Sequence, residues 1–341
     1  MTNLSDLKVL ALDDPLLRDA VEMSQRFGRD PEYTRGGGGN SSVKADGIVY
    51  IKPSGVSLAV IEAEDLVPLA TGPLLDLLLK GGSEDDEARV AGAPDPVMRA
   101  AAKVRMAEAK GRRPSVELMF HSLLPESFVL HTHAIVPNAV TCNLQGEELM
   151  TDLFGDEALW VPYTDPGLPL ARTINELRAA HSARTGKPAP RITFMGDHGI
   201  IVSAETTDEI ATLNEHVMGT VKGALERAGI TVGASGRAAA RIAADEARAK
   251  AIVNKIGPAL RGLLSAEGQP LKLVTYDPAP TAADYLESED GRAAVLGGAM
   301  TPDQIVYSGS FPLLFDPPAG ADPEDIPALL TEALATHVEQ H

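Results

Sequence analysis

The 341-residue chain contains one cysteine, Cys142, and few aromatic residues, which make up 4% of the sequence. A single cysteine excludes an internal disulfide and any metal site built from several thiolates. We interpret Cys142 as a small residue of the protein interior. No apolar run approaches the ~18 residues that a membrane-spanning helix needs. The first twenty residues carry several acids and lack the basic-then-apolar order of a secretory signal. We therefore expect a cytoplasmic protein without a membrane partner.

Basic residues are also scarce, because 30 Lys and Arg stand against 48 Asp and Glu, a formal net charge of −18. Nucleic acids and anionic membranes are bound by surfaces of positive charge. The composition therefore argues against both as partners. It leaves room for a small anionic substrate, provided that backbone amides and a few chosen cations hold it. A hydrophobic fraction of 44% is enough for a sizeable core.

Apolar periodicity predicts helices that alternate with short strands. Helical spacing is found over residues 14–28, 96–110, 111–125, 134–143, 168–186 and 206–229. Strands are predicted over 127–133 and 157–163, and two more over 191–203 with a break at 196–199. Short connections between consecutive strands favour a layered α/β fold with a mainly antiparallel sheet. The tail is expected to contain an alanine-rich helix over 236–251, a strand over 272–277 and a terminal helix.

Two histidines stand out in the apolar segment ESFVLHTHAIVPNAV, residues 126–140. His131 and His133 are two positions apart, so a strand would point both to the same side. Catalytic zinc sites use three protein ligands, commonly neutral imidazoles, and keep one position open. His198, between two glycines at the predicted strand break, is a candidate third ligand. The alternative is that these are partly buried histidines that hydrogen-bond to the backbone.

Glu117 is the candidate acid/base of such a site, because a carboxylate near a metal serves as a ligand or moves protons. Most helical glutamates are solvated surface residues. Glu117, however, lies in the apolar stretch VELMF at residues 116–120. His121 lies one turn further along the same helix face, where it would hydrogen-bond behind the site or bind the metal itself.

The glycine-rich stretch RGGGGNSS, residues 35–42, is a candidate phosphate cradle, because consecutive backbone amides bind anions. The segment IKPSG at 51–55 and a serine before Glu117 add donors. The candidate phosphate ligands are Gly39, Asn40, Ser42, Lys44, Ser54, Gly55 and Ser115. Glycine-rich loops are common, however. The lysines of this region, Lys52 included, are alternatively solvent-facing strand residues, and Ser115 is alternatively a helix cap.

The order of these motifs, GGGGNSS, IKPSG, PSVE, HTH and then HG, resembles the class II aldolase/adducin family over about residues 14–230. The segments FGDEALWVPYTDPGLPLA, IGPALRGLLS and AMTPDQIVYSGSFPLLFD resemble the aldolase half of bifunctional rhamnulose-1-phosphate aldolase/short-chain dehydrogenases. A dinucleotide-binding GxGxxG after a strand is missing from the sequence. We therefore expect a stand-alone relative of that aldolase half.

The resemblance implies a three-layer α/β/α fold with a mainly antiparallel central sheet over residues 1–233. Residues 234–341 would be an extension that packs on this domain or on a neighbouring subunit. His131, His133 and His198 would hold one divalent metal per subunit, usually Zn²⁺. Glu117 would be the acid/base, and the residues named above would hold the substrate phosphate. The family's usual assembly is a homotetramer.

The resemblance further implies an aldolase, a carbon–carbon lyase. Its expected substrate is a phosphorylated ketose, such as a 6-deoxyketose 1-phosphate, cleaved into a dihydroxyacetone-phosphate-like ketone and an aldehyde. Two departures leave the sugar open. Ser115-Val116-Glu117 replaces the Ser-Ser-Glu of fuculose-phosphate aldolases, and their tyrosine has no clear counterpart, with Phe154 and Tyr163 nearest. The alternatives are an epimerase, a decarboxylase or a dehydratase with the same metal site, a non-catalytic adducin-like module, and a metal-binding domain tied to a dehydrogenase partner.

Overall fold

The computed structural model describes residues 4–80, 96–107, 111–230, 246–265, 268, 270–276 and 279–340. The chain divides into two compact units. The first comprises Met1–Gly229 and Met300–Asp303, and the second comprises Ile230–Ala299 and Gln304–His341. Whether residues 233 and 234 separate two domains stays a prediction. Among the described helices, none is both long and apolar enough to cross a membrane.

A seven-stranded sheet forms the centre of the first unit. Its strands are β1 (Asn40–Ala45), β2 (Ile48–Ile51), β3 (Val67–Ala70), β4 (Phe128–Thr132), β5 (Ala158–Val161), β6 (Ile192–Met195) and β7 (Gly199–Ala204). They are ordered β3-β2-β1-β4-β7-β6-β5. Every neighbouring pair is antiparallel except β5 and β6. The predicted α/β class with a mainly antiparallel sheet is confirmed.

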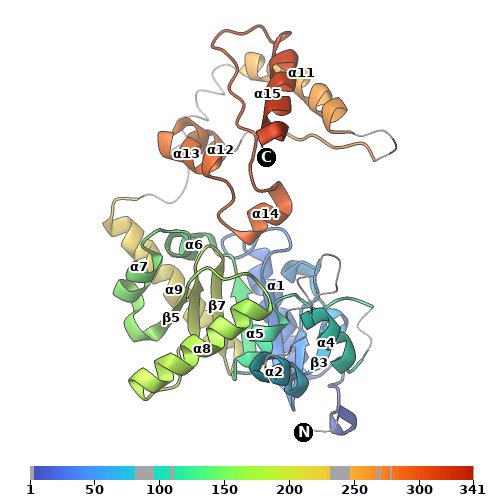
Figure 1. The fold of residues 1–341 in the computed structure, drawn as a ribbon, viewed down its shortest axis with the longest axis vertical. Helices are drawn as coiled ribbons and strands as arrows, with labels where there is room; N and C mark the ends of the chain where they lie inside the picture. The colour runs from blue at the N-terminus through green and yellow to red at the C-terminus, as the bar shows by residue number, and fades with distance from the viewer. Residues whose placement is uncertain are drawn as a thin grey trace. The chain divides into compact units, whose positions relative to one another are not determined.

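Helices cover both faces of this sheet, which gives three layers (Figure 1). The helices of the first unit are α1 (Pro15–Arg29), α2 (Thr71–Lys80), α4 (Pro96–Val104), α5 (Leu118–Leu123), α6 (Ile135–Thr141), α7 (Gly146–Phe154), α8 (Leu168–Thr185) and α9 (Thr207–Arg227). Single 3-10 turns span Leu4–Asp6, Leu58–Val60, Ala63–Asp65 and Gly155–Glu157. One apolar core lies under α1, α6, α7 and α9, and the other under α2, α4, α5 and α8. Strand alternation creates the two cores, because successive side chains enter opposite layers.

The strongest helix signals of the sequence are confirmed. The Asp14 side chain caps α1 by accepting a hydrogen bond from the Leu16 amide, and Thr206 caps α9 through the Glu209 amide. The predicted strand pair over 191–203 and the helices over 134–143 and 168–186 are confirmed as β6, β7, α6 and α8. In each case, local capping and periodicity agree with the tertiary packing.

Two predicted helices are too long, for the same physical reason. The helix predicted over 96–110 ends at Val104, because Arg105 pairs with Leu69 beside the sheet. The helix predicted over 111–125 begins only at Leu118. Before it, Pro114 forms an isolated β-bridge with Pro53, and residues 116–117 form a turn. Sheet pairing therefore prevails over helical periodicity in both places.

The second unit is described by helices α11 (Glu246–Leu264), α12 (Pro280–Glu287), α13 (Glu289–Gly297) and α15 (Ile326–Gln340). Helix α14 (Pro302–Ser308) begins within Met300–Asp303, which belongs to the first unit. The strand predicted over 272–277 is wrong where it can be judged, because residues 272–276 form no strand. Most of the helix predicted over 236–251 lies outside the described residues. The predicted terminal helix is confirmed as α15.

Candidate active site

The two histidines of the HTH motif lie at the end of the central strand β4. In this register His131 is opposite Asn40 on β1 and Ile201 on β7. Directly opposite residues point their side chains to the same face of a sheet. His131 is fully buried and packs edge-on against Phe120 of α5, with 5.7 Å between ring centroids. The apolar run of the sequence thus fixes one imidazole between two strands and a helix.

His198 reaches the same place from the turn between β6 and β7. Asp197 adopts a positive φ of 51° in this turn, and the Asp197 amide donates a hydrogen bond to the Thr141 carbonyl. Next to it, a Cβ on Gly199 would overlap the Thr132 carbonyl oxygen. The glycine therefore lets the turn approach the end of β4. The ring centroids of His131 and His198 are 4.9 Å apart, and those of His133 and His198 are 5.2 Å apart.

The ring nitrogens of the three histidines fit a divalent cation. One ligand atom from each of His131, His133 and His198 lies within 4.8 Å of the others. The Nδ1 of His131 lies 2.9 Å from the Ile200 carbonyl oxygen, and that of His133 lies 2.7 Å from Asp303 Oδ2. Each Nδ1 is therefore placed to donate to an oxygen, and each ring directs its Nε2 toward the cluster. The two Nε2 atoms are 2.9 Å apart, within hydrogen-bond distance, so both rings point Nε2 at the same place.

Glu117 closes the fourth side of this cluster. It lies at the N-terminal end of α5, with Oε1 3.0 Å from His198 Nε2 and Oε2 3.5 Å from His131 Nε2. Only 6% of the residue is exposed. A carboxylate in contact with two imidazoles is placed either to bind a metal that they hold or to act beside it.

A chain of buried hydrogen bonds holds the Glu117 carboxylate from behind. The Asn40 amide donates to Glu117 Oε2 at 2.5 Å and to Ser115 Oγ at 3.2 Å. The Asn40 carbonyl oxygen accepts from His121 Nε2, so His121 Nδ1 accepts the Ser42 hydroxyl at 2.8 Å. His121 therefore hydrogen-bonds behind the site, and its ring nitrogens do not join the histidine cluster. This is the first of the two roles that the sequence left open.

Burial sets the protonation states of these groups. It lowers the pKa of His131 to about 3, against the opposing effect of Glu117. Burial together with the charge of Lys44 holds the pKa of His121 well below its usual range. Burial raises the pKa of Glu117, but the neighbouring rings of His131 and His198 outweigh it and hold this pKa well below its usual range. At neutral pH the lowered pKa values leave the His131 ring neutral and the Glu117 carboxylate ionised, the forms in which these side chains bind metals.

Two glycines of the glycine-rich loop lie close to other parts of the chain. Gly39 has a φ of +71°, and a Cβ on it would lie 2.6 Å from the carbonyl oxygen of His131. A Cβ on Gly38 would overlap both carboxylate oxygens of Asp303. Gly39 is therefore required where the loop passes the backbone of β4, and Gly38 leaves room for the Asp303 side chain.

The candidate phosphate ligands fall into two groups. Ser54 and Gly55 are exposed. They lie beside Ser115, because the Ser54 amide bonds to the Arg113 carbonyl and the Ser115 amide to the Lys52 carbonyl. The side chains of Ser42 and Lys44, by contrast, form hydrogen bonds to His121. The Ser42 hydroxyl bonds to the His121 ring, and Lys44 Nζ donates to the His121 carbonyl at 3.0 Å. The binding of phosphate by any of these residues stays a prediction.

Lys44 provides a test of this packing through pH. Burial lowers the pKa of Lys44 to about 8, against the opposing charges of Glu126 and Glu205. The folded protein then releases this proton at lower pH than the unfolded chain, so stability rises with pH between about 8 and 10. For one lysine the slope is at most ~1.4 kcal/mol per pH unit. Urea unfolding of the wild type and Lys44→Met should show the wild type gaining stability relative to the variant across this window. Parallel pH profiles would contradict the burial of this amine.

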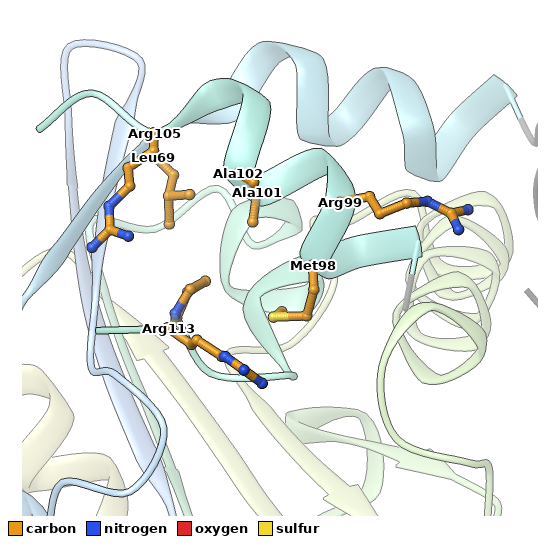
Figure 2. Close-up of a pocket in the computed structure, with 8 residues that line it drawn as sticks. Leu69, Met98, Arg99, Ala101, Ala102, Arg105 and Arg113 are labelled. Carbon is orange, nitrogen blue, oxygen red and sulfur yellow. The ribbon is translucent and has the colours of Figure 1, made fainter. Parts of the chain in front are cut away.

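A separate hollow of about 500 Å³ lies beside α4 (Figure 2). It is lined by Leu69, Met98, Arg99, Ala101, Ala102, Arg105, Arg113 and Pro114. The Arg105 guanidinium is bonded to the carbonyls of Ala107 and Arg112. Neither the histidine cluster nor Glu117 lines this hollow. The hollow is therefore separate from the histidine cluster.

The comparison with protein families shows to which family the chain belongs. The model of the class II aldolase and adducin N-terminal domain matches residues 18–225. The chain belongs to the class II aldolase and adducin family. The matched range contains all three histidines and Glu117. The resemblance that the motif order indicated is confirmed.

Individual relatives of this aldolase-family chain are distant. A curated relative from Bacillus subtilis (strain 168), the uncharacterized oxidoreductase YuxG, is 25% identical over 313 residues, which are 88% of this chain and 42% of the relative. The chain thus spans less than half the length of that protein. The N-terminal class II aldolase domain of a conserved protein from Thermoplasma acidophilum is 20% identical, with a TM-score of 0.51 over 64% of this chain and 97% of that domain. The structural likeness shows the fold.

Two residues of the site were not selected from the sequence. Lys52 is 3% exposed, and burial lowers its pKa to about 8 against the opposing charges of Glu117 and Asp303. Lys52 belongs to the segment IKPSG, which the sequence singles out, but the sequence also allowed a solvent-facing strand residue at this position. Asp303 lies in the tail segment AMTPDQIVYSGSFPLLFD, whose resemblance to relatives assigned no role to any residue. The tyrosine question stays open, since Phe154 is a core residue and Tyr163 is 62% exposed.

Proposed function

We propose that this protein is a divalent-metal-dependent aldolase that cleaves a phosphorylated ketose into a dihydroxyacetone-phosphate-like ketone and an aldehyde. One observation carries the proposal. The Glu117 carboxylate contacts His198 and His131, two members of a cluster whose three ring nitrogens converge. A proton-transfer group and a candidate metal site therefore meet at one point, as carbon–carbon cleavage next to a carbonyl requires.

His131, His133 and His198 would hold the cation. When bound, a divalent cation supplies Lewis-acid stabilisation of the enediolate that forms as the bond breaks. Glu117 takes the proton from the hydroxyl of the carbon that becomes the aldehyde. The electrons of the cleaved carbon–carbon bond pass to the ketone half. Glu117 then returns the proton to the carbon that lost the bond, so that the carboxylate is regenerated.

The residues behind Glu117 keep it aimed at the reacting atoms. Asn40 donates to Oε2, and Asn40 is itself fixed by His121 and, through that ring, by Ser42. A neutral His121 donates from one nitrogen and accepts at the other. The hydrogen bonds therefore all run in one direction, from the Ser42 hydroxyl through His121 and Asn40 to Glu117. Such a fixed carboxylate loses little orientational freedom during the reaction.

We place the substrate phosphate near Ser54, Gly55 and Ser115. Gly55 has a φ of +78°, a conformation that turns backbone amides outward. Buried Lys52 supplies a positive charge close to Glu117. Asn40, the first residue of β1, borders the same region through its hydrogen bond to Ser115, and Gly39 precedes it in the chain. In this arrangement Ser42 and Lys44 support α5 and do not bind the ligand.

The wider assignment follows the family. We propose that the resident cation is zinc, although imidazole ligands also suit other first-row metals. We further propose a cytoplasmic homotetramer, because the family's usual assembly is a tetramer. Epimerases, decarboxylases and dehydratases use the same groups, and a substrate screen separates them.

The screen uses the purified chain loaded with Zn²⁺ and a panel of ketose 1-phosphates. Aldehyde release is followed by an NADH-dependent dehydrogenase, carbon dioxide release by a coupled assay, and epimerisation by NMR of the recovered sugar. An aldolase releases one aldehyde and one ketone phosphate per turnover. Conversion of sugars without aldehyde release would overturn the aldolase assignment and favour one of the other activities.

A further inference from the structure

A carboxylate from far along the chain touches the histidine cluster from outside. Asp303 Oδ2 lies 2.7 Å from His133 Nδ1, and the side chains are 22% and 9% exposed, respectively. The two residues are 170 positions apart in sequence. Asp303 belongs, with Met300, to the short stretch of the tail that is part of the first unit.

The contact is made on the side of the ring that faces away from the other histidines. In an imidazole, Nδ1 and Nε2 point in different directions, and His133 directs Nε2 at His131. His131 has the matching arrangement, with Nδ1 on the Ile200 carbonyl oxygen. Each ring is therefore held at one nitrogen while the other is presented to the cluster. Metal-binding histidines commonly have such a partner, and losing it costs about 10–100-fold in metal affinity.

The glycine-rich loop makes room for this carboxylate. A Cβ on Gly38 would overlap both oxygens and the Cγ of Asp303. Lys52 is near enough for the Asp303 charge to act on its ammonium. The loop, a buried cation and a histidine thus surround one side chain. A surface aspartate in chance contact would have no such surroundings.

We propose that Asp303 is a positioning residue that fixes the tautomer and the orientation of His133 and so presents its Nε2 to the metal. This inference rests on the proposed function, since it needs the histidine cluster to bind a cation. It assigns to the tail of the chain a part in building the metal site.

The test compares four variants of the full chain. Asp303→Asn removes the charge with little change of shape, and Asp303→Glu restores a carboxylate. Gly38→Ala displaces the Asp303 carboxylate without altering it. Asp152→Asn, at an exposed position of α7, is the matched control. For each protein, the Zn²⁺ dissociation constant is measured by chelator competition, and the visible absorption spectrum is recorded after loading with Co²⁺. Circular dichroism of the metal-free proteins checks folding.

We expect Asp303→Asn and Gly38→Ala to weaken Zn²⁺ binding about 10–100-fold and to shift the Co²⁺ spectrum. Asp303→Glu should recover part of the affinity, and Asp152→Asn should match the wild type. If the wild type binds the cation and Asp303→Asn binds it equally well with the same spectrum, this inference alone is overturned. A wild-type chain that binds no cation overturns the proposed function and this inference together.

Discussion

Glu117→Gln is expected to lower the rate of aldehyde release by about 10²–10⁴-fold, the usual contribution of a positioned acid/base group. The amide keeps the size of the side chain and still accepts the hydrogen bond from Asn40, but it cannot carry the proton. Cation binding should persist, because the three imidazoles are intact. The measurement is the steady-state rate of cleavage of the best ketose 1-phosphate, beside the bound metal per chain.

The matched control is Glu147→Gln, an exposed glutamate in the first turn of α7. It should retain the wild-type rate and the wild-type metal content. Turnover by Glu117→Gln close to that of the wild type would show that another group moves the proton. That result would leave the metal cluster in place but remove the central catalytic role from Glu117.

His198→Ala is expected to weaken cation binding by more than about 100-fold and to abolish cleavage. Losing a direct ligand exceeds the 10–100-fold cost of losing a supporting partner. The variant keeps His131 and His133, whose Nε2 atoms lie 2.9 Å apart. Isothermal titration of the metal-free protein with Zn²⁺ measures the affinity, and the coupled assay measures cleavage at saturating Zn²⁺.

His216→Ala serves as the control, because His216 lies on α9 in an exposed ion pair with Glu157. Its Zn²⁺ affinity should equal that of the wild type. Equal affinity in the wild type and in His198→Ala would place the cation outside the histidine cluster. The structure would then need a different explanation for three converging imidazoles.

The part of the site that follows strand alternation could be predicted from the sequence. His131 and His133 were recognisable as a pair because they are two positions apart in an apolar strand. His198 was recognisable as a redirected side chain between two glycines at a strand break. Both patterns depend on a few neighbouring residues, which is why local reasoning found them.

The contacts behind the cluster could not be predicted, because they join elements far apart in the sequence. Asn40 reaches Glu117 only because α5 packs on the face of β1 that carries Ser42. No spacing rule links a residue at position 40 to one at 117, or His133 to Asp303. The bond of the Ser42 hydroxyl to the His121 ring is such a contact, and the predicted binding of phosphate by Ser42 stays a prediction.

Titrating the metal-free protein with Zn²⁺, while bound metal and aldehyde release are measured on the same samples, tests the central claim most directly. The claim is that one cation held by His131, His133 and His198 serves carbon–carbon cleavage. The rate should rise in proportion to the bound cation and level off at about one equivalent per chain. Cleavage at the full rate by protein freed of metal would contradict the account.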